Sequence, residues 1–238
     1  MPIHVFSALS NLNLNMITTV YIIRHGLTIN AEEKRYSGHL DVPLSEEGEK
    51  QIGRLADHLV HEANESQLPG SAGNALGCIY CSDLQRSRRS AEIIARSFGL
   101  QPIIIPRLRE RGFGRWEGMT FDEINRKYPD EFMAWINNPL TFFPVGGEST
   151  EAVRDRVMPA FRDIIEKEKG KKTAIVAHGG VNRIIICELL GVSLQNMFRI
   201  EQDYSALNVF SFHGEFAVLR RMNFVAAGSR GHVSHQMK

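Results

Sequence analysis

The chain has 238 residues, of which 43% are hydrophobic and 23% are charged, and its formal net charge is +1 at pH 7. This length and composition are ordinary for one soluble globular domain. The small net charge gives no reason to expect a nucleic-acid or membrane-surface partner, and no stretch approaches the run of about eighteen apolar residues that spans a bilayer. Three cysteines argue against a disulfide framework and predict a reducing, cytoplasmic location.

The two ends of the chain differ from its middle. Residues 1–16 lack the basic region and the apolar core of a signal peptide, so we expect a disordered N-terminal extension. Met16, directly before the first strand, is an alternative start of the chain. Residues 223–238 are small, polar and aperiodic, which predicts a flexible C-terminal tail. Residues 17–222 are then expected to be a single domain.

Between these ends, short β-branched runs alternate with amphipathic segments. The predicted strands are TTVYII at 18–23, GCIYCSD at 77–83, PIIIP at 102–106, KKTAIVA at 171–177 and a hairpin over 206–220 that turns at His213 and Gly214. The predicted helices cover 45–62, 84–99, 149–169 and 180–191, the first with Ser45 as its N-cap and the second ending at Gly99. Residues 66–75 are expected to form a loop.

This alternation predicts an α/β fold, a three-layer sandwich with a mostly parallel central sheet and helices on both faces. Residues 120–148 are interrupted by three prolines, and we expect them to form a small helical cap insertion over the site. Most aromatic side chains of this segment should pack the cap onto the domain. Phe142 or Phe143 is predicted to face the bound ligand.

Ionisable side chains follow four of the predicted strands at the point where each strand ends. Arg24 and His25 end the first strand, Arg86 and Glu110 lie shortly after the second and the third, and His178 ends the fourth. In open α/β sheets, ligands bind beyond the carboxyl ends of the strands. A single histidine or arginine in such a place is usually an ordinary structural residue, but five groups that the topology brings to one edge predict a functional site.

Six segments around these residues resemble, in order, the motifs of one known family. They are RHGLT, RYSGHLDVPLSEEG, SDLQRSRRSAEII, LRERGFGRWEG, GGES and AHGG, all within residues 18–215. On these motifs the chain is identified as a member of the histidine phosphatase superfamily, also called phosphoglycerate mutase-like, in its branch of small phosphatases and cofactor-dependent mutases. Its overall pattern is most similar to alpha-ribazole phosphatases and broad-specificity phosphatases.

The resemblance implies a reaction and a role for each residue. The reaction is the hydrolysis of a small phosphorylated metabolite through a phosphohistidine, without a metal or another cofactor. His25 is implied as the nucleophile, Glu110 as the proton donor to the leaving oxygen, and Arg24, Arg86 and His178 as ligands of the phosphoryl oxygens. The implied substrate-binding residues are Arg24, Thr28, Asn30, Ser37, Gly38, Arg86, Arg111 and Gly179.

Elementary chemistry supports these roles independently. A phosphoryl group in transfer spreads its charge over its equatorial oxygens, and the guanidiniums of Arg24 and Arg86 are donors that stay charged. The glycines after His178 let backbone amides approach an anion at a helix N-terminus. Positive neighbours disfavour the imidazolium form, so they should keep His25 neutral, while a bound phosphate favours the protonated form of Glu110.

Several histidines, cysteines and acids of the chain could in principle form sites of another kind. His25, His178 and Glu110 could form a metal site, but the adjacent arginines would repel a divalent cation. Cys78 and Cys81 are expected to pack in the core rather than to bind zinc or act in redox chemistry. The pair His232 and His235 is a weak metal-site pattern, and His39 is expected at the surface rather than in the pocket.

Two other functions stay open at the level of the sequence. One is a phosphoglycerate mutase primed by 2,3-bisphosphoglycerate, and the other is a non-catalytic phosphate-binding module, either of which could be a monomer or a homodimer. The segment between Glu110 and GGES lacks the long insertion of mutases, which favours a phosphatase, although Arg111 matches an arginine of the mutases. Ala31 stands where relatives usually carry a phosphate-binding asparagine, so either Asn30 serves instead or the pocket lacks one ligand.

Overall fold

The computed structural model describes residues 17–65 and 76–228. The predicted N-terminal extension, the predicted loop at 66–75 and most of the predicted tail lie outside the described residues. His232 and His235 lie outside them as well.

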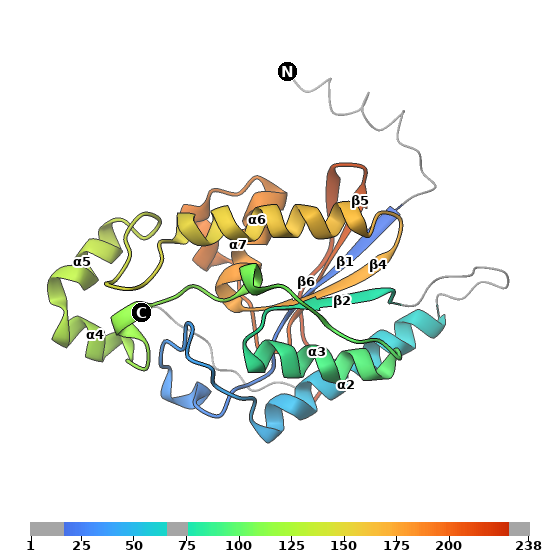
Figure 1. The fold of residues 1–238 in the computed structure, drawn as a ribbon, viewed down its shortest axis with the longest axis horizontal. Coiled ribbons are helices and arrows are strands. Elements are labelled where there is room, and N and C mark those ends of the chain that lie inside the picture. Colours follow the sequence, from blue (N-terminus) through green and yellow to red (C-terminus); the bar gives the residue numbers. More distant parts are fainter. Residues whose placement is uncertain (1–16, 66–75, 229–238) are drawn as a thin grey trace, which may run out of the picture.

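A six-stranded sheet with the strand order β3-β2-β4-β1-β5-β6 forms the middle layer (Figure 1). Its strands are β1 (Ile17–Arg24), β2 (Cys78–Cys81), β3 (Ile103–Ile104), β4 (Lys172–Ala177), β5 (Leu207–His213) and β6 (Phe216–Phe224). Strands β1 to β4 run parallel, whereas β5 runs antiparallel to β1 and β6 runs antiparallel to β5. The prediction of a mostly parallel sheet is confirmed.

The register of β1 and β4 determines where the site is built. Arg24, the last residue of β1, pairs with Ala177, the last residue of β4. The residue that follows each of these strands is a histidine. His25 and His178 therefore leave the same edge of the sheet at the same level, and the backbone N–H of His25 donates a hydrogen bond to the carbonyl oxygen of Ala177 at 3.1 Å.

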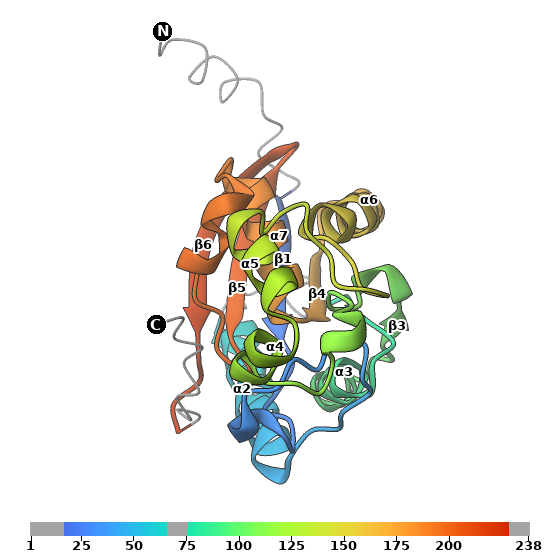
Figure 2. The ribbon, with the colours of Figure 1, turned by 90° about the vertical axis from the view of Figure 1, so that its left-hand side faces the viewer.

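Helices cover both faces of the sheet, as predicted (Figures 1 and 2). One face carries α6 (Thr150–Lys167) and α7 (Gly179–Leu190), and the other carries α2 (Glu46–Glu65) and α3 (Gln85–Ser97). Neighbouring residues of β1 enter different cores, because Ile22 packs with α6 and α7 while Ile23 packs with α2 and α3. Burial on both faces explains why this strand is a continuous apolar run rather than an alternating one.

Local signals begin and end elements close to the predicted places. The hydroxyl oxygen of Ser45 accepts a hydrogen bond from the backbone N–H of Gly48 at 3.0 Å, as an N-cap of α2 does. The hairpin turns between His213 and Phe216. Strand β6 ends at Phe224, which pairs with Leu207 of β5 after an irregular stretch of the ladder, so the pairing extends beyond the predicted end of the domain.

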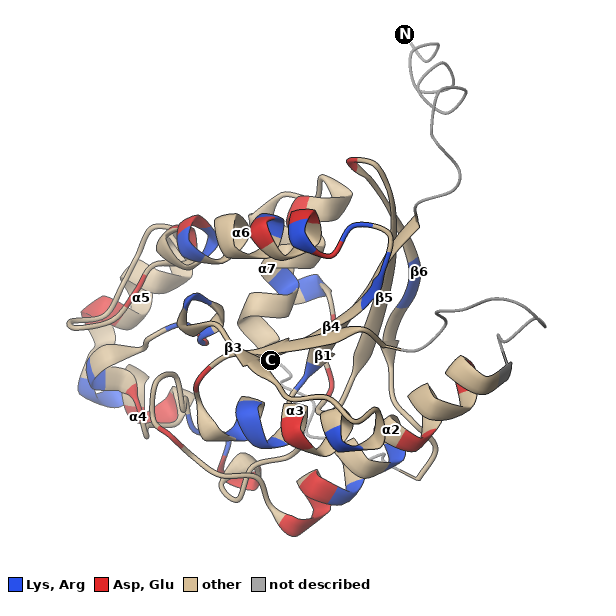
Figure 3. Cartoon of the chain, turned by 45° about the vertical axis from the view of Figure 1, so that its right-hand side comes forward, with Lys and Arg blue, Asp and Glu red and all other residues tan. Residues whose placement is uncertain are grey.

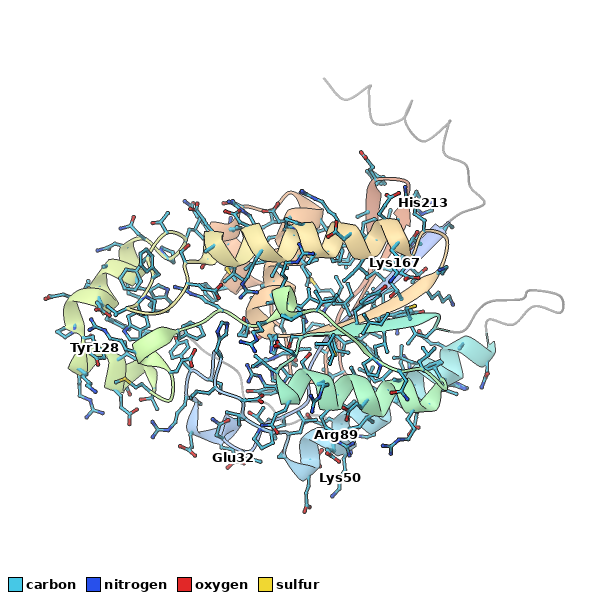
Figure 4. The ribbon with its side chains drawn as sticks, in the orientation of Figure 1. Glu32, Lys50, Arg89, Tyr128, Lys167 and His213 are labelled. Atoms are coloured by element: carbon cyan, nitrogen blue, oxygen red, sulfur yellow. The ribbon has the colours of Figure 1, made fainter. Side chains whose placement is uncertain are left out.

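Segment 120–148 forms a cap beyond the carboxyl edge of the sheet (Figure 1). It contains α4 (Phe121–Lys127) and α5 (Pro129–Asn137). The described residues also form the short 3-10 helices η1 (Ala31–Glu33), η2 (Pro106–Leu108), η3 (Gly114–Trp116) and η4 (Leu194–Arg199). Trp116, Ile124, Phe132 and Trp135 form the small core of the cap. Aromatic side chains fill the space between its two helices, near Tyr128 (Figure 4).

Positions of basic and acidic residues are interspersed over the helices and loops (Figure 3). Many of them pair, as in the bidentate contact between Arg109 and Asp83 and the contact between Arg89 and Glu49, each with an N–O distance of 2.7 Å. Among the helices that the structure describes, none combines the length and the apolar character that a bilayer crossing requires.

Two glycines of α2 give a matched test of this packing. A methyl group at Gly48 would overlap the carbonyl oxygen of Leu27, in the loop that follows His25, whereas a methyl group at Gly53 would meet nothing within 4 Å. We expect Gly48→Ala to lower the free energy of unfolding by about 1–3 kcal/mol, because the strand-to-helix loop must move. Gly53→Ala should raise it by about 0.5–1 kcal/mol. Urea titration measures both, and equal effects of the two substitutions would refute the close approach.

Candidate active site

The two histidines at the ends of β1 and β4 meet in a buried position. Their ring centroids lie 5.2 Å apart in an edge-to-face arrangement. His25 is 5% exposed and His178 is fully buried. Of the two, only His25 lines the cavity at this edge of the sheet, while His178 lies behind it with its Nε2 at 2.7 Å from the hydroxyl oxygen of Ser82.

The environment of His25 fixes both its charge and its tautomer. Burial lowers the pKa of His25 well below its ordinary value, and the guanidiniums of Arg86 and Arg24 lower that pKa further. A neutral imidazole carries one proton. The Nδ1 atom lies 2.8 Å from the carbonyl oxygen of Gly26, which can only accept a hydrogen bond. The proton therefore sits on Nδ1, and Nε2 has a free lone pair.

Two arginines beside His25 are held by neutral groups. Arg86 is 2% exposed, and its two terminal nitrogens donate hydrogen bonds to the carbonyl oxygens of Leu40 and Gly38, each at 2.7 Å. Arg24 donates to the carbonyl oxygen of Gln202, and its buried Nε has no partner among the described residues. Because carbonyl oxygens do not cancel their charge, both guanidiniums remain available to an anion.

Glu110 approaches the same place from the loop after β3. Its carboxylate accepts hydrogen bonds from the backbone N–H of Gly180, at 3.0 Å, and from its neighbour Arg111, at 2.9 Å. A side chain at Gly180 would begin 2.5 Å from a carboxylate oxygen of Glu110. The absence of a side chain at Gly180 therefore makes room for the carboxylate of Glu110. From the sequence alone, this glycine is expected to contact a bound anion instead.

An arginine on α6 holds the loop that carries Glu110. Arg156 donates hydrogen bonds of 2.8 to 2.9 Å to the carbonyl oxygens of residues 107, 109 and 110. It also makes a bidentate contact with Glu148, at 2.7 and 2.8 Å. Burial alone would raise the pKa of Glu148, but the hydrogen bonds from Arg156 and from the N–H of Gly112 hold that pKa below its ordinary value. No motif or spacing in the sequence points to this role of Arg156.

His39 lies partly exposed outside the cavity, in line with the expectation, and it contacts the same loop. Its Nε2 lies 2.9 Å from the carbonyl oxygen of Glu110 and 3.7 Å from a carboxylate oxygen of Glu148. It does not line the cavity, and its side chain is 36% exposed. Through this contact, His39 helps to hold the backbone of the loop that carries Glu110.

A cavity of about 390 Å³ opens at the carboxyl edge of the sheet, within the size range of small-molecule sites. The predicted residues that line it are Arg24, His25, Thr28, Ser37, Gly38, Arg86, Glu110, Arg111 and Gly179. Asn30 does not line it, because its side-chain oxygen accepts the hydroxyl hydrogen bond of Thr28 at 3.0 Å. Asn30 thus reaches the cavity only through Thr28.

Part of the cavity wall consists of residues that the sequence motifs do not predict. The additional charged and aromatic lining residues include Arg35, Tyr36, Phe113, Trp135, Arg183, Phe198, Glu201, Asp203 and Tyr204. The ring of Tyr204 lies 3.9 Å below the guanidinium carbon of Arg24 and 5.6 Å from the ring of His25. One of these residues could be predicted from its spacing. Arg183 follows Gly179 by one helical turn, so the two residues share one face of α7.

The prediction for Phe142 and Phe143 is wrong. Phe142 stacks on Trp116 at 5.4 Å between ring centroids, and Phe143 is 60% exposed. Neither lines the cavity, where Trp135 of α5 supplies the aromatic surface of the cap. The carbonyl oxygen of Phe142 instead accepts a hydrogen bond from Arg111, whose guanidinium is turned toward the rim of the cavity.

The two closely spaced cysteines pack in the core, as predicted. Cys81 lies in the core that faces α2 and α3, whereas Cys78 packs against the opposite core. Since they lie on opposite faces of the sheet, they cannot share a metal ion. Within residues 17–65 and 76–228, no group of three or more histidines, cysteines or acids is arranged to hold a metal ion.

The fold is that of an α/β protein with a cavity beyond the carboxyl ends of its strands, and the lining of this cavity includes the guanidiniums of Arg24 and Arg86. A family model of the histidine phosphatase superfamily (branch 1) matches residues 20–225, and the chain belongs to this family. It is 31% identical to phosphoglycerate mutase-like protein 4 of Arabidopsis thaliana, over 89% of this chain and 91% of that protein. It is 30% identical to phosphoserine phosphatase 1 of Hydrogenobacter thermophilus, over 85% and 90%.

A solved structure has the same architecture. The putative alpha-ribazole-5'-P phosphatase of Escherichia coli superimposes with a TM-score of 0.75 at 27% sequence identity. The match covers 89% of this chain and 98% of that one. The sheet and helices described above are therefore those of a histidine phosphatase fold.

The state of His25 is open to direct measurement. We expect its ring to stay neutral in the folded protein while the pH falls through about 6.5, the ordinary pKa of histidine, because burial and two guanidiniums lower its pKa. In urea, histidines should titrate near the ordinary value. The unfolded state then binds more protons, so the free energy of unfolding should decrease as the pH falls below about 6.5. Ring ¹⁵N shifts followed against pH provide the test, and a folded-state titration of His25 at or above that value would contradict it.

Proposed function

We propose that the protein is a metal-independent phosphomonoester hydrolase that acts through a phosphohistidine on a small phosphorylated metabolite. The observation that carries the proposal is the tautomer of His25, whose Nδ1 is tied to the carbonyl oxygen of Gly26 while its neutral Nε2 is free beside two guanidiniums. An imidazole nitrogen with a free lone pair is a nucleophile, and paired guanidiniums stabilise a phosphoryl group in transfer.

In the first step, Nε2 of His25 attacks phosphorus, a nitrogen–phosphorus bond forms and the bond to the ester oxygen breaks. Arg24 and Arg86 neutralise the charge on the phosphoryl oxygens. Glu110, which lines the same cavity, gives its proton to the leaving oxygen, so the alcohol departs uncharged. The negative charge of the bound phosphate favours the protonated form of Glu110 that this step needs.

In the second step, water attacks the phosphohistidine. Glu110 accepts one proton of that water, the oxygen–phosphorus bond forms, and the nitrogen–phosphorus bond breaks to return the neutral imidazole. The products are the alcohol and inorganic phosphate, and Glu110 is protonated again for the next cycle. Ser37 and Gly38 are proposed to complete the phosphate site, with Thr28 the contact through which Asn30 acts. His178, which does not line the cavity, is proposed to position the ring of His25 from behind. A cytoplasmic location and a monomeric or homodimeric state are part of the proposal.

Names of relatives support a phosphatase over the alternatives, since they include phosphoserine phosphatase 1 and an alpha-ribazole phosphatase. A phosphoglycerate mutase is the second candidate, favoured by the relative called phosphoglycerate mutase-like protein 4. It would need a bisphosphorylated cofactor to prime His25. The short connection from Glu110 to Glu148, which forms α4, α5 and the rim, speaks for the phosphatase.

The first test is phosphate release from a panel of phosphomonoesters in the presence of EDTA. We expect turnover that His25→Ala reduces by roughly a thousandfold or more, because the nucleophile is lost. His213→Ala is the matched control, since His213 lies at the opposite end of β1, paired with Ile17. Loss of activity with EDTA, or full activity of His25→Ala, would rule out the proposed mechanism. Transfer of phosphate between hydroxyls without release would favour the mutase.

The role of Glu110 predicts a dependence on the leaving group. Glu110→Gln should lower kcat/KM by roughly 10²- to 10⁴-fold for alkyl phosphates, whose alkoxide needs a proton. The loss should be much smaller for p-nitrophenyl phosphate, because p-nitrophenolate leaves without one. Glu151→Gln, at the start of α6 and outside the cavity, controls for the loss of one carboxylate. Equal losses on both substrate types would show that Glu110 is not the acid.

A further inference from the structure

Arg183 brings a further guanidinium to the cavity, beside that of Arg24. It lies on α7 one turn after Gly179. A Cβ atom built on Gly179 would lie 3.3 Å from a terminal nitrogen of Arg183 and 3.4 Å from the guanidinium carbon of Arg24. The two guanidiniums thus flank the same glycine at the N-terminus of α7, and Arg183 stands next to the proposed phosphate site.

The guanidinium of Arg183 is oriented but not satisfied. Its Nε donates a hydrogen bond to the carbonyl oxygen of Ile200 at 2.7 Å, which fixes the plane of the group. Within residues 17–65 and 76–228, its two terminal nitrogens have no hydrogen-bond partner and no carboxylate within 4 Å. Burial, followed by the charge of Arg24, lowers the pKa of Arg183 to about 10, so the side chain is still a cation at neutral pH.

Two other arginines of the cavity differ in this respect. Arg35 contacts the carboxylates of Glu33 and Glu123. Arg111 donates to the oxygens of Glu148, Thr150 and Phe142 through all three of its nitrogens. Arg183 therefore presents an open, coplanar pair of donors to the cavity.

We propose that Arg183 forms a second anion subsite that binds a carboxylate of the substrate, so that the preferred substrate is a small phosphomonoester bearing a carboxylate. This inference rests on the proposed function, because Arg24, Arg86 and His25 are taken to hold the phosphate. The two terminal nitrogens of a guanidinium match the two oxygens of a carboxylate. Since Arg24 and Arg183 flank one glycine, the phosphate and the carboxylate must be separated by only a few bonds.

A carboxylate fits this subsite better than a second phosphate does. Glu201 and Asp203 line the same cavity, and their charges act on Arg183. A dianion would meet about twice the repulsion from these acids that a monoanion meets. Because Glu201 and Asp203 offset part of the positive charge of Arg183, the subsite is better suited to a monoanionic carboxylate than to a dianionic phosphate.

Matched substrates that differ in the carboxylate test the subsite. One pair is O-phosphoserine and O-phosphoethanolamine, and the other is 3-phosphoglycerate and glycerol 3-phosphate. In the natural protein we expect kcat/KM to favour the carboxylated member by roughly 10- to 100-fold, the range of a charge-assisted contact. Arg183→Met should bring both ratios close to one, and Arg183→Lys should leave intermediate ratios because the charge stays and the fork is lost.

Arg162→Met is the matched control, because Arg162 is an exposed arginine of α6 outside the cavity. It should leave both ratios unchanged. Equal losses for both members of a pair in Arg183→Met would show that Arg183 holds the transferred phosphate instead. No preference in the natural protein, or a preference for glycerol 1,3-bisphosphate over 3-phosphoglycerate, would overturn the carboxylate assignment.

Binding to the His25→Ala protein gives a readout that needs no turnover. By calorimetry, the Kd for O-phosphoserine should be lower than that for O-phosphoethanolamine, and adding Arg183→Met should abolish the difference. If the natural protein releases no phosphate but this difference persists, the hydrolase proposal fails and the subsite stands. If phosphate is released without any difference in binding or in kcat/KM, the subsite fails and the hydrolase stands. Thermal unfolding of Arg183→Met confirms that the variant is folded.

Discussion

The carboxyl edge of the sheet buries two guanidiniums that no carboxylate of the described residues contacts, and the properties of the site depend on this imbalance. Arg86 is 2% exposed, and among the described residues neither it nor Arg24 has an acidic partner within 4 Å. Backbone carbonyls hold both groups in place. Burying an uncompensated charge costs free energy. An anion that enters the cavity offsets part of this cost. The folded protein therefore holds its cationic groups in place before an anion binds, which favours binding.

This positive charge also selects the state of the groups around it. It adds to burial in lowering the pKa of His25, which keeps the nucleophile neutral. Glu110 accepts hydrogen bonds from two backbone N–H groups, which hold its carboxylate in the cavity. The neutral state of His25 is thus a property of the fold and needs no ligand.

The sequence allowed the fold and much of the cavity to be predicted, because both follow from local patterns. Apolar runs that end in charged residues indicate parallel strands, and parallel strands bring their ends to one edge. The features that the sequence did not predict depend on contacts between residues that lie far apart in the chain. Trp135 rather than Phe142 faces the cavity because of the way α5 packs, which no spacing reveals. Arg156 reaches three carbonyl oxygens of a loop almost fifty residues earlier in the chain.

His25 and Glu110, the proposed nucleophile and the proposed acid, are held mainly by different parts of the molecule. His25 is tied to the sheet through the hydrogen bond to Ala177. The loop of Glu110 is tied to Arg156 on α6 and to Glu148, where the cap rejoins the domain. The core between α6 and the sheet separates these two supports, and the hydrogen bond from the backbone N–H of Gly180 links Glu110 directly to α7. Since interiors are close-packed and transmit small shifts, the placement of Glu110 relative to His25 depends on that core as much as on the cavity. Arg156 and Glu148 join the cap to the loop that carries Glu110.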